Sequence, residues 1–229
     1  MTIEYLRTLK KKHLLLDVSL WSGDLLNMDA SIDKTEQISD CYHLDVADAH
    51  FVHGLLFFPD LIQAINNKTH ILLHSHLMMD NPMDHLDDFI EAGSDIITTH
   101  VELGTEKVKS ILNYLNQKKI GAGLAICVNS DVNILKPYLE QIDLILVMGT
   151  QIGIKGVEMD PATPKRIEAI KTMLDENGLG NRIIVSVDGG IRTHTVPLIR
   201  AAGADMITPG SLIFKSEDIA KTVSWLYSL

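Results

Sequence analysis

Two histidines and two aspartates are spaced so that together they could bind a metal ion. His43 and Asp45 lie two residues apart in an otherwise apolar run, so in a strand both side chains would point to the same face. His76 stands near the end of the next apolar run, and Asp188 ends a later one. A His–Asp pair alone is more typical of a buried hydrogen bond, but two imidazoles and two carboxylates suit a divalent ion such as zinc, manganese, iron or cobalt.

Glycine recurs in three successive loops late in the chain. These loops contain Gly153 and Gly156, Gly189 and Gly190, and Gly210 and Ser211. A tight turn needs glycine for its own sake, but adjacent glycines also let backbone N–H groups converge on an anion. With no arginine prominent in these loops, we expect backbone N–H groups and helix N-termini to bind a phosphate group there.

Other histidines are candidates for supporting roles. His74 lies two positions before His76 and would share its face, so we expect it either to orient His76 or to be a core residue. His53 and His100 follow predicted strands and could line the site. The remaining histidines lie at element starts or in helices and are interpreted as structural or exposed: His13, His70, His85 and His194.

Eight short apolar runs predict the strands that must position these side chains. The runs are residues 14–19, 42–46, 71–77, 95–100, 121–128, 144–148, 183–187 and 206–209. Segments with helical spacing lie between them, and Pro59 and Pro164 mark two helix starts. This alternation in 229 residues predicts an α/β fold, a single (β/α)8 TIM barrel. An open doubly wound sheet is the alternative.

Two similar segments, four units apart, favour a closed barrel. Residues 91–97 and 201–207 each predict the end of a helix, a glycine and the start of a strand. Gly93 and Gly203 are predicted to adopt a left-handed backbone conformation. A generic loop between a helix and a strand would explain them equally well. The longest connection, residues 149–163, follows a strand, at the end of a barrel where active sites lie. Residues 1–12 predict a short amphipathic N-terminal helix.

Composition and charge narrow the possible partners. The formal net charge of −10 opposes binding to nucleic acid or to anionic membranes. Cys41 and Cys127 are too few for a disulfide framework and are expected to be buried thiols. The N-terminal stretch lacks the apolar region of a signal peptide, and no apolar run approaches the roughly 20 residues that span a bilayer. We therefore expect a cytoplasmic protein, and we expect it to form a homo-oligomer.

Several motifs together resemble the ribulose-phosphate 3-epimerase family, which includes allulose-6-phosphate epimerases. The similarity runs from about Asp17 to Phe214. It is carried by Ser19-Leu-Trp-Ser22-Gly-Asp24, His43-Leu-Asp45-Val-Ala-Asp48-Ala-His50-Phe-Val52, His76-Leu-Met78, Asn81-Pro82, Ala92-Gly-Ser-Asp95, Val187-Asp188-Gly-Gly-Ile191 and Gly210-Ser-Leu-Ile-Phe214.

The resemblance implies an isomerase, a metal-dependent 3-epimerase of a phosphorylated ketose. His43, Asp45, His76 and Asp188 would bind one divalent ion, and Asp45 and Asp188 would be the paired acid and base on opposite sides of the substrate. A proton removed next to the ketone would leave an enediolate that the metal stabilises. The other implied contacts are Ser19, Met78 and Met148 facing the substrate, and Gly156, Gly189, Gly190, Gly210 and Ser211 around its phosphate.

The chain also departs from the family pattern. Ala47-Asp48-Ala49 replaces the usual Met-Asp-Gly, His74 takes a position commonly occupied by Asp, and Cys127 stands where the family has Asn. His53 replaces a usual proline, and the loop after the sixth predicted strand is rebuilt. These changes predict epimerisation of an altered ketose phosphate. The alternatives are a lyase or decarboxylase on a sugar phosphate, and a non-catalytic sugar-phosphate-binding protein.

Overall fold

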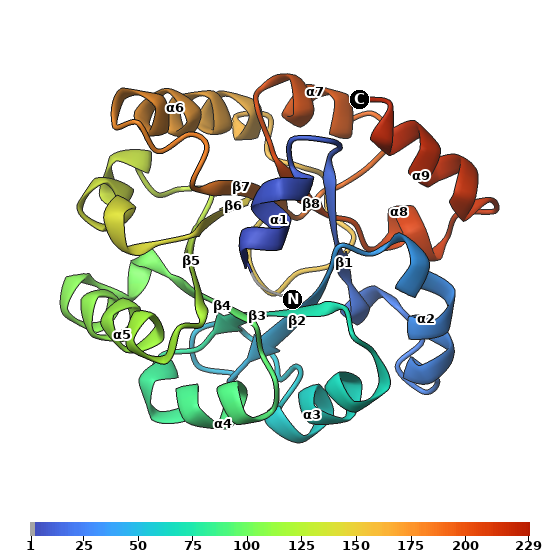
Figure 1. Ribbon diagram of the computed structural model, residues 1–229, viewed down its shortest axis with the longest axis horizontal. Helices are drawn as coiled ribbons and strands as arrows, with labels where there is room; N and C mark the ends of the chain where they lie inside the picture. Colours follow the sequence, from blue (N-terminus) through green and yellow to red (C-terminus); the bar gives the residue numbers. More distant parts are fainter. Residues whose placement is uncertain (1–2) are drawn as a thin grey trace.

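Eight parallel strands close into a barrel in the computed structural model, which describes residues 3–229 (Figure 1). The strands are β1 (Leu15–Ser19), β2 (Cys41–Ala47), β3 (Leu72–Met78), β4 (Ile96–His100), β5 (Gly121–Ile126), β6 (Leu144–Met148), β7 (Ile184–Asp188) and β8 (Met206–Thr208). The barrel closes where β1 pairs with β8 through Leu15 and Met206. The predicted (β/α)8 barrel is confirmed, and the open sheet is wrong because neither β1 nor β8 is an edge strand.

Helices surround the strands on the outside of the barrel (Figure 1). The α-helices are α1 (Ile3–Leu9), α2 (Met28–Thr35), α3 (Pro59–Lys68), α4 (Leu86–Glu91), α5 (Thr105–Lys118), α6 (Thr163–Glu176), α7 (Val196–Ala201), α8 (Ser211–Phe214) and α9 (Ile219–Tyr227). The 3-10 segments are η1 (Leu20–Ser22), η2 (Glu36–Ile38), η3 (Pro82–His85), η4 (Val101–Leu103) and η5 (Val132–Gln141). In η5, Pro137 lacks the N–H that an α-helix would use.

The predicted helix boundaries have the expected backbone chemistry. Pro59 begins α3, and Pro164 occupies the first turn of α6. After α4 and α7 the chain turns through Gly93 and Gly203, whose φ angles are +103° and +104°. Both glycines therefore adopt the left-handed conformation predicted from the two similar segments, and each is followed by a strand.

Residues of β2 alternate between the two sides of the barrel wall. Tyr42, Leu44 and Val46 are buried in the apolar layer between the strands and the helices. His43 and Asp45 point the other way, into the barrel, as the two-residue spacing predicts. The interior therefore carries a polar layer toward the carboxyl ends of the strands.

The opposite end of the interior is apolar, and α1 lies across it (Figure 1). Leu6 of α1 packs with Leu15 and Met206 at the start of their strands. The Arg7 side chain donates a hydrogen bond to the carbonyl oxygen of Arg182 at 2.6 Å. Part of the expected N-terminal helix, Met1 and Thr2, lies outside the described residues. Closure of this end leaves the carboxyl ends of the strands as the face open to a substrate.

Both cysteines are free thiols, Cys41 buried and Cys127 half-buried, so the expectation that both are buried is wrong for Cys127. Cys127 follows β5, where the backbone leaves the barrel wall. No helix within residues 3–229 combines the length and the apolar character needed to cross a membrane.

Candidate active site

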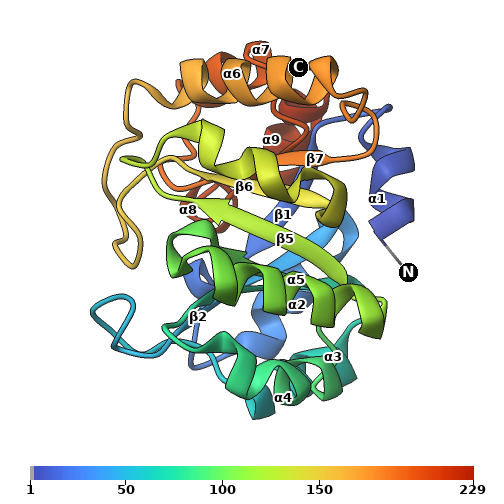
Figure 2. The same cartoon turned by 90° about the vertical axis from the view of Figure 1, so that its left-hand side faces the viewer.

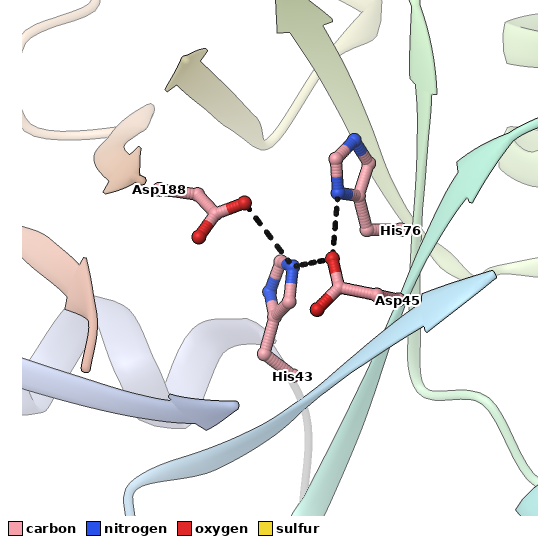
Figure 3. A group of neighbouring side chains, drawn as sticks. All are labelled: His43, Asp45, His76 and Asp188. Carbon is pink, nitrogen blue, oxygen red and sulfur yellow. Dashed lines mark hydrogen bonds and ion pairs between the residues drawn. The ribbon is translucent and has the colours of Figure 1, made fainter. Parts of the chain in front are cut away.

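The four candidate ligands come together inside the barrel (Figure 3). His43 and Asp45 extend from β2, His76 from β3 and Asp188 from the end of β7. One potential ligand atom from each lies within 4.8 Å of the others. Asp45 Oδ1 is 3.2 Å from His43 Nε2 and 3.3 Å from His76 Nδ1, and Asp188 Oδ2 is 3.9 Å from His43 Nε2. The parallel register places Asp45 directly beside His76.

The environment of His43 fits a cation at the centre of this cluster. Its Nδ1 is 2.8 Å from Asp17 Oδ2, so Nδ1 carries a proton and donates a hydrogen bond to the carboxylate. Within the described chain its buried Nε2 has no hydrogen-bond partner, although two carboxylates face it. A lone pair directed at two negative charges is unfavourable unless a cation lies between them. The donor set therefore fits a divalent metal ion.

The two carboxyl groups of the cluster have opposite pKa shifts. Burial raises the pKa of Asp188 to about 7, and the charge of Asp45 acts in the same direction. Burial also acts to raise the pKa of Asp45, but His43 and His76 outweigh burial and hold this pKa below its usual range. Two carboxyl groups whose pKa values are pushed apart can serve as acid and base.

The two imidazoles also differ. Burial would lower the pKa of His43, but the carboxylates of Asp45 and Asp17 outweigh burial and raise it well above its ordinary value. Burial lowers the pKa of His76 to about 3, so this ring is neutral. In the absence of a cation, a proton on His43 Nε2 would balance the charge of the cluster.

The residues behind the cluster were only partly predicted. Asp17 is a site residue that the sequence prediction missed, although an Asp within the apolar run of residues 14–19 is a detectable signal; the structure shows it fully buried. His74 is fully buried and bonds to Asp17 Oδ2 at 2.7 Å and to Thr98 Oγ1 at 2.7 Å, so of the two predicted alternatives the structure supports a core residue and not one that orients His76. Both His43 and His74 bond to the same carboxylate oxygen.

His100 and His53 have different environments. His100 is fully buried at the end of β4, and its Nε2 is 2.8 Å from Nε2 of His76. His53 is exposed on the loop after β2 and does not line the cavity next to the cluster. Of these two histidines, only His100 is in contact with a candidate ligand.

A cavity of about 780 Å³ opens beside the cluster. Asp45 and Asp188 line it, and Ser19 donates a hydrogen bond to Asp45 Oδ2 at 3.3 Å. The long loop after β6 lies over this end, and Figure 2 shows it projecting on the same side as the loop after β2. The cavity is also lined by the remaining residues predicted to contact substrate or phosphate: Met78, Met148, Gly153, Gly156, Gly189, Gly190, Gly210 and Ser211.

Cationic side chains also line the cavity, and none of them was predicted as a site residue. Arg192 lies two residues after Gly190, in the loop that leads to α7, so the expectation that no arginine takes part in these loops is wrong. Lys215 follows α8 at the same end. Lys155 lies over the Trp21 ring, with its Nζ 4.1 Å from the ring centre. These cations strengthen the electrostatic attraction of the cavity for an anion.

Comparisons with known proteins agree with the sequence motifs. A family model described as the ribulose-phosphate 3 epimerase family matches residues 15–214. A ribulose-phosphate 3-epimerase of Chlamydia pneumoniae is 32% identical over 212 residues, covering 92% of each chain. A ribulose-phosphate 3-epimerase of Bacillus subtilis (strain 168) is 29% identical over 207 residues, covering 90% of this chain and 94% of the relative. The resemblance is confirmed.

Solved structures with the same barrel are more distant. 3-Hexulose-6-phosphate synthase from Salmonella typhimurium has a TM-score of 0.65 at 18% identity, covering 93% of this chain and 97% of that one. Orotidine 5'-phosphate decarboxylase from Pyrococcus horikoshii OT3 has a TM-score of 0.62 at 15% identity, covering 93% and 98%. At these identities the likeness shows the fold and leaves the reaction to the site.

Proposed function

This chain belongs to the ribulose-phosphate 3-epimerase family, and we propose that the cluster of His43, Asp45, His76 and Asp188 is its catalytic centre. The protein is an isomerase, a 3-epimerase of a phosphorylated ketose. The observation that carries the proposal is the unpartnered, buried Nε2 of His43 facing two carboxylates. Two carboxylates around one imidazole nitrogen favour a cation between them, and the fourth potential ligand, His76, favours a metal ion over a proton on Nε2.

The four residues would hold one divalent ion, either zinc, manganese, iron or cobalt. When bound, such an ion stabilises the negative charge of the enediolate that forms when a proton leaves the carbon next to a ketone. The chain's own part is to orient the ligands. Asp17 does so for His43 by accepting a hydrogen bond from its Nδ1–H, which leaves Nε2 free to bind.

Asp45 and Asp188 would exchange protons with the substrate on its two faces. The low pKa of Asp45 keeps it ionised and able to accept the proton at carbon 3. Without a bound ion, burial raises the pKa of Asp188 to about 7, which makes it the carboxyl group of the pair that takes up a proton more readily, and we assign it proton delivery to the opposite face. Their origin on β2 and β7 supports this division, since three strand-to-strand steps separate these strands around the barrel. The reverse reaction exchanges the two roles.

The substrate's phosphate would bind at the glycine-containing loops after β6, β7 and β8. Gly156, Gly189 and Gly190 have φ angles of +80°, +94° and +70°, which support tight turns that turn N–H groups toward an anion. Arg192 and Lys215 line the same cavity and would add positive charge. A remote phosphate can position the reacting carbons and raise turnover as well as affinity.

We expect ribulose 5-phosphate to be a poorer substrate than a related ketose phosphate. Ala47 pairs with Met78 beside the cavity and leaves room where the family usually has methionine. In the rebuilt loop after β6, Lys155 also lines the cavity, with its Nζ 4.1 Å from the centre of the Trp21 ring. The change at position 47 and the rebuilt loop both alter the lining around the sugar and leave the four candidate ligands in place.

The remaining partners follow from charge and family. The net charge of −10 supports a small-molecule substrate and no nucleic acid partner. A homo-oligomer is part of the proposal and is tested by analytical ultracentrifugation. A cytoplasmic location is also part of it, and a relative from Oryza sativa is named a cytoplasmic isoform of the enzyme.

The test combines metal analysis with a substrate panel. The purified protein should contain one divalent ion per chain, and kcat/KM should be measured for ribulose 5-phosphate, allulose 6-phosphate and both free sugars. Metal-loaded Asp188→Asn should not epimerise, although exchange of the carbon 3 proton with solvent deuterium can persist on the Asp45 side. Equal use of free and phosphorylated sugars would refute the phosphate site. Normal epimerisation by metal-loaded Asp188→Asn would refute the two-carboxylate mechanism.

A further inference from the structure

The Nε2 atoms of His76 and His100 lie 2.8 Å apart, and both side chains are fully buried. At this distance the two nitrogens share one proton, because two N–H groups would repel each other and so would two lone pairs. One imidazole therefore donates and the other accepts. Which ring donates decides where His76 carries its proton, and hence whether its Nδ1 is free to bind a metal ion.

Glu102 decides the direction of this hydrogen bond from the far side of His100. Its Oε1 accepts hydrogen bonds from the Cys127 backbone N–H at 2.8 Å and the Ser130 hydroxyl at 2.5 Å. Its Oε2 is 3.2 Å from His100 Nδ1. Burial would raise the pKa of Glu102, but the bonds from His100, Ser130 and the Cys127 N–H lower it to about 2. An ionised carboxylate only accepts, so His100 must carry its proton on Nδ1.

The position of the proton on His100 then determines the position of the proton on His76. With the one proton of His100 on Nδ1, its lone pair is on Nε2, which accepts a hydrogen bond from His76 Nε2. His76 then has its lone pair on Nδ1, the atom that faces Asp45 in the cluster. We propose that Glu102, acting through His100, is a positioning residue that selects the tautomer of His76 able to bind the metal ion. This inference rests on the proposed metal site.

The opposite arrangement has identifiable costs. It would place a proton on His76 Nδ1, which Asp45 Oδ1 at 3.3 Å could accept, and it would block that nitrogen from a metal ion. It would also turn the His100 Nδ1 lone pair toward the Glu102 carboxylate. Cys127 Sγ, 3.5 Å from His100 Nδ1, could serve that lone pair, but a thiol is a weak donor. A hydrogen bond to a carboxylate is about twice as strong as a neutral one, so Glu102 outweighs Cys127 and opposes the pull of Asp45.

The main experiment compares cobalt affinity in Glu102→Gln and wild-type protein, by competition with a chromophoric chelator. Gln keeps the size of the side chain, but its NH₂ group can donate to His100 Nδ1 and favour the blocked tautomer of His76. Loss of a partner behind a ligating imidazole typically weakens metal binding about 10- to 100-fold, and we expect a loss in that range with a changed Co²⁺ visible spectrum. Glu106→Gln, exposed in the first turn of α5, is the matched control and should bind as wild type.

A second variant, His100→Phe, distinguishes the proposed effect of Glu102 on His76 through His100, here called the relay, from a general effect on folding. In His100→Phe, the intermediate ring nitrogen is gone, so adding Glu102→Gln should cause no further loss of Co²⁺ affinity. The melting temperatures of the metal-free variants report any purely structural damage. In zinc-loaded wild-type protein, ¹⁵N histidine spectra should show His100 protonated on Nδ1 alone, a measurement that needs no variant.

Three outcomes would overturn the relay: Co²⁺ affinity of Glu102→Gln within twofold of wild type, an equal loss in the His100→Phe background, or a proton on His100 Nε2 in the zinc-loaded protein. Failure of the wild-type protein to bind one equivalent of Co²⁺ would instead refute the proposed metal site. The two failures are therefore distinguishable.

Discussion

Replacing Asp17 with Asn should weaken metal binding without touching any candidate ligand. The Asp17 side chain is fully buried, and Oδ2 accepts from His43 Nδ1 at 2.8 Å and from His74 Nδ1 at 2.7 Å. An Asn oxygen at this position can still accept both bonds, so the change removes the charge and keeps the shape. The burial of all three side chains makes this charge matter more than it would at the surface.

The size of the effect on metal binding follows from the bond between Asp17 and His43. Hydrogen bonds to charged groups contribute about 1.5–3 kcal/mol, against about 1 kcal/mol for neutral ones. Losing the charge should therefore weaken this bond by about 0.5–2 kcal/mol. If this loss appears in metal binding, the affinity falls about 2- to 30-fold, since each 1.4 kcal/mol is tenfold.

The assay is chelator competition for Zn²⁺ on metal-free protein, with the melting temperature measured beside it. Asp205→Asn is the control, because it also removes the charge of a hydrogen-bonded carboxylate: the half-buried Asp205 accepts a bond from the Val185 backbone N–H at 3.0 Å. It lies before β8, at the end of the barrel opposite the cluster, and should lower stability without changing Zn²⁺ affinity. A folded Asp17→Asn protein with wild-type Zn²⁺ affinity would show that His43 does not depend on Asp17. An equal affinity loss in Asp205→Asn would show that the effect is not local.

His76→Ala should lower metal content and activity together, because an incomplete ligand set binds poorly; full occupancy with unchanged turnover would contradict its role as a ligand. In metal-free protein the pKa of Asp188 is raised to about 7, so protonation of this group stabilises the folded state. The contribution, up to about 4 kcal/mol, is fully present below about pH 4 and is lost as the pH rises to 7. Denaturant unfolding of wild type and Asp188→Asn between pH 4 and 7 should therefore give a difference in free energy that shrinks with pH, and a constant difference would contradict the raised pKa. Gly156→Ala should strain the loop after β6, because Gly156 has a φ angle of +80° although its added Cβ would meet open space; KM for the phosphorylated ketose should rise with metal content unchanged, and an unchanged KM would contradict the phosphate site. Gly190→Ala should instead lower the melting temperature, because its Cβ would lie 2.6 Å from the Met159 backbone, and a wild-type melting temperature would show that this contact relaxes.

Local sequence patterns determined the elements and the candidate ligands. Strands and helices impose periods of about 2 and 3.6 residues on the placement of apolar side chains, and those periods can be read without knowing any long-range contact. The same reasoning placed His43 and Asp45 on one face, as the structure has them. Glycine turns were predictable for a similar reason, since Gly93 and Gly203 follow directly from helix ends. The proposed phosphate loops rest on the same kind of local signal.

The tertiary structure alone decided which buried groups meet behind the ligands. Asp17 and His74 are 57 positions apart, and their 2.7 Å contact exists only because β1, β2 and β3 lie side by side in one register. The approach of His100 to His76, and of Glu102 to the backbone after β5, depends in the same way on the pairing of β4 with β3 and with β5. Proton positions and pKa shifts depend on the distances between these groups and on their burial. Neither the distances nor the burial can be obtained from a local sequence pattern. The sequence thus determined which residues can do chemistry, while the packing of the barrel determined how each is charged and held.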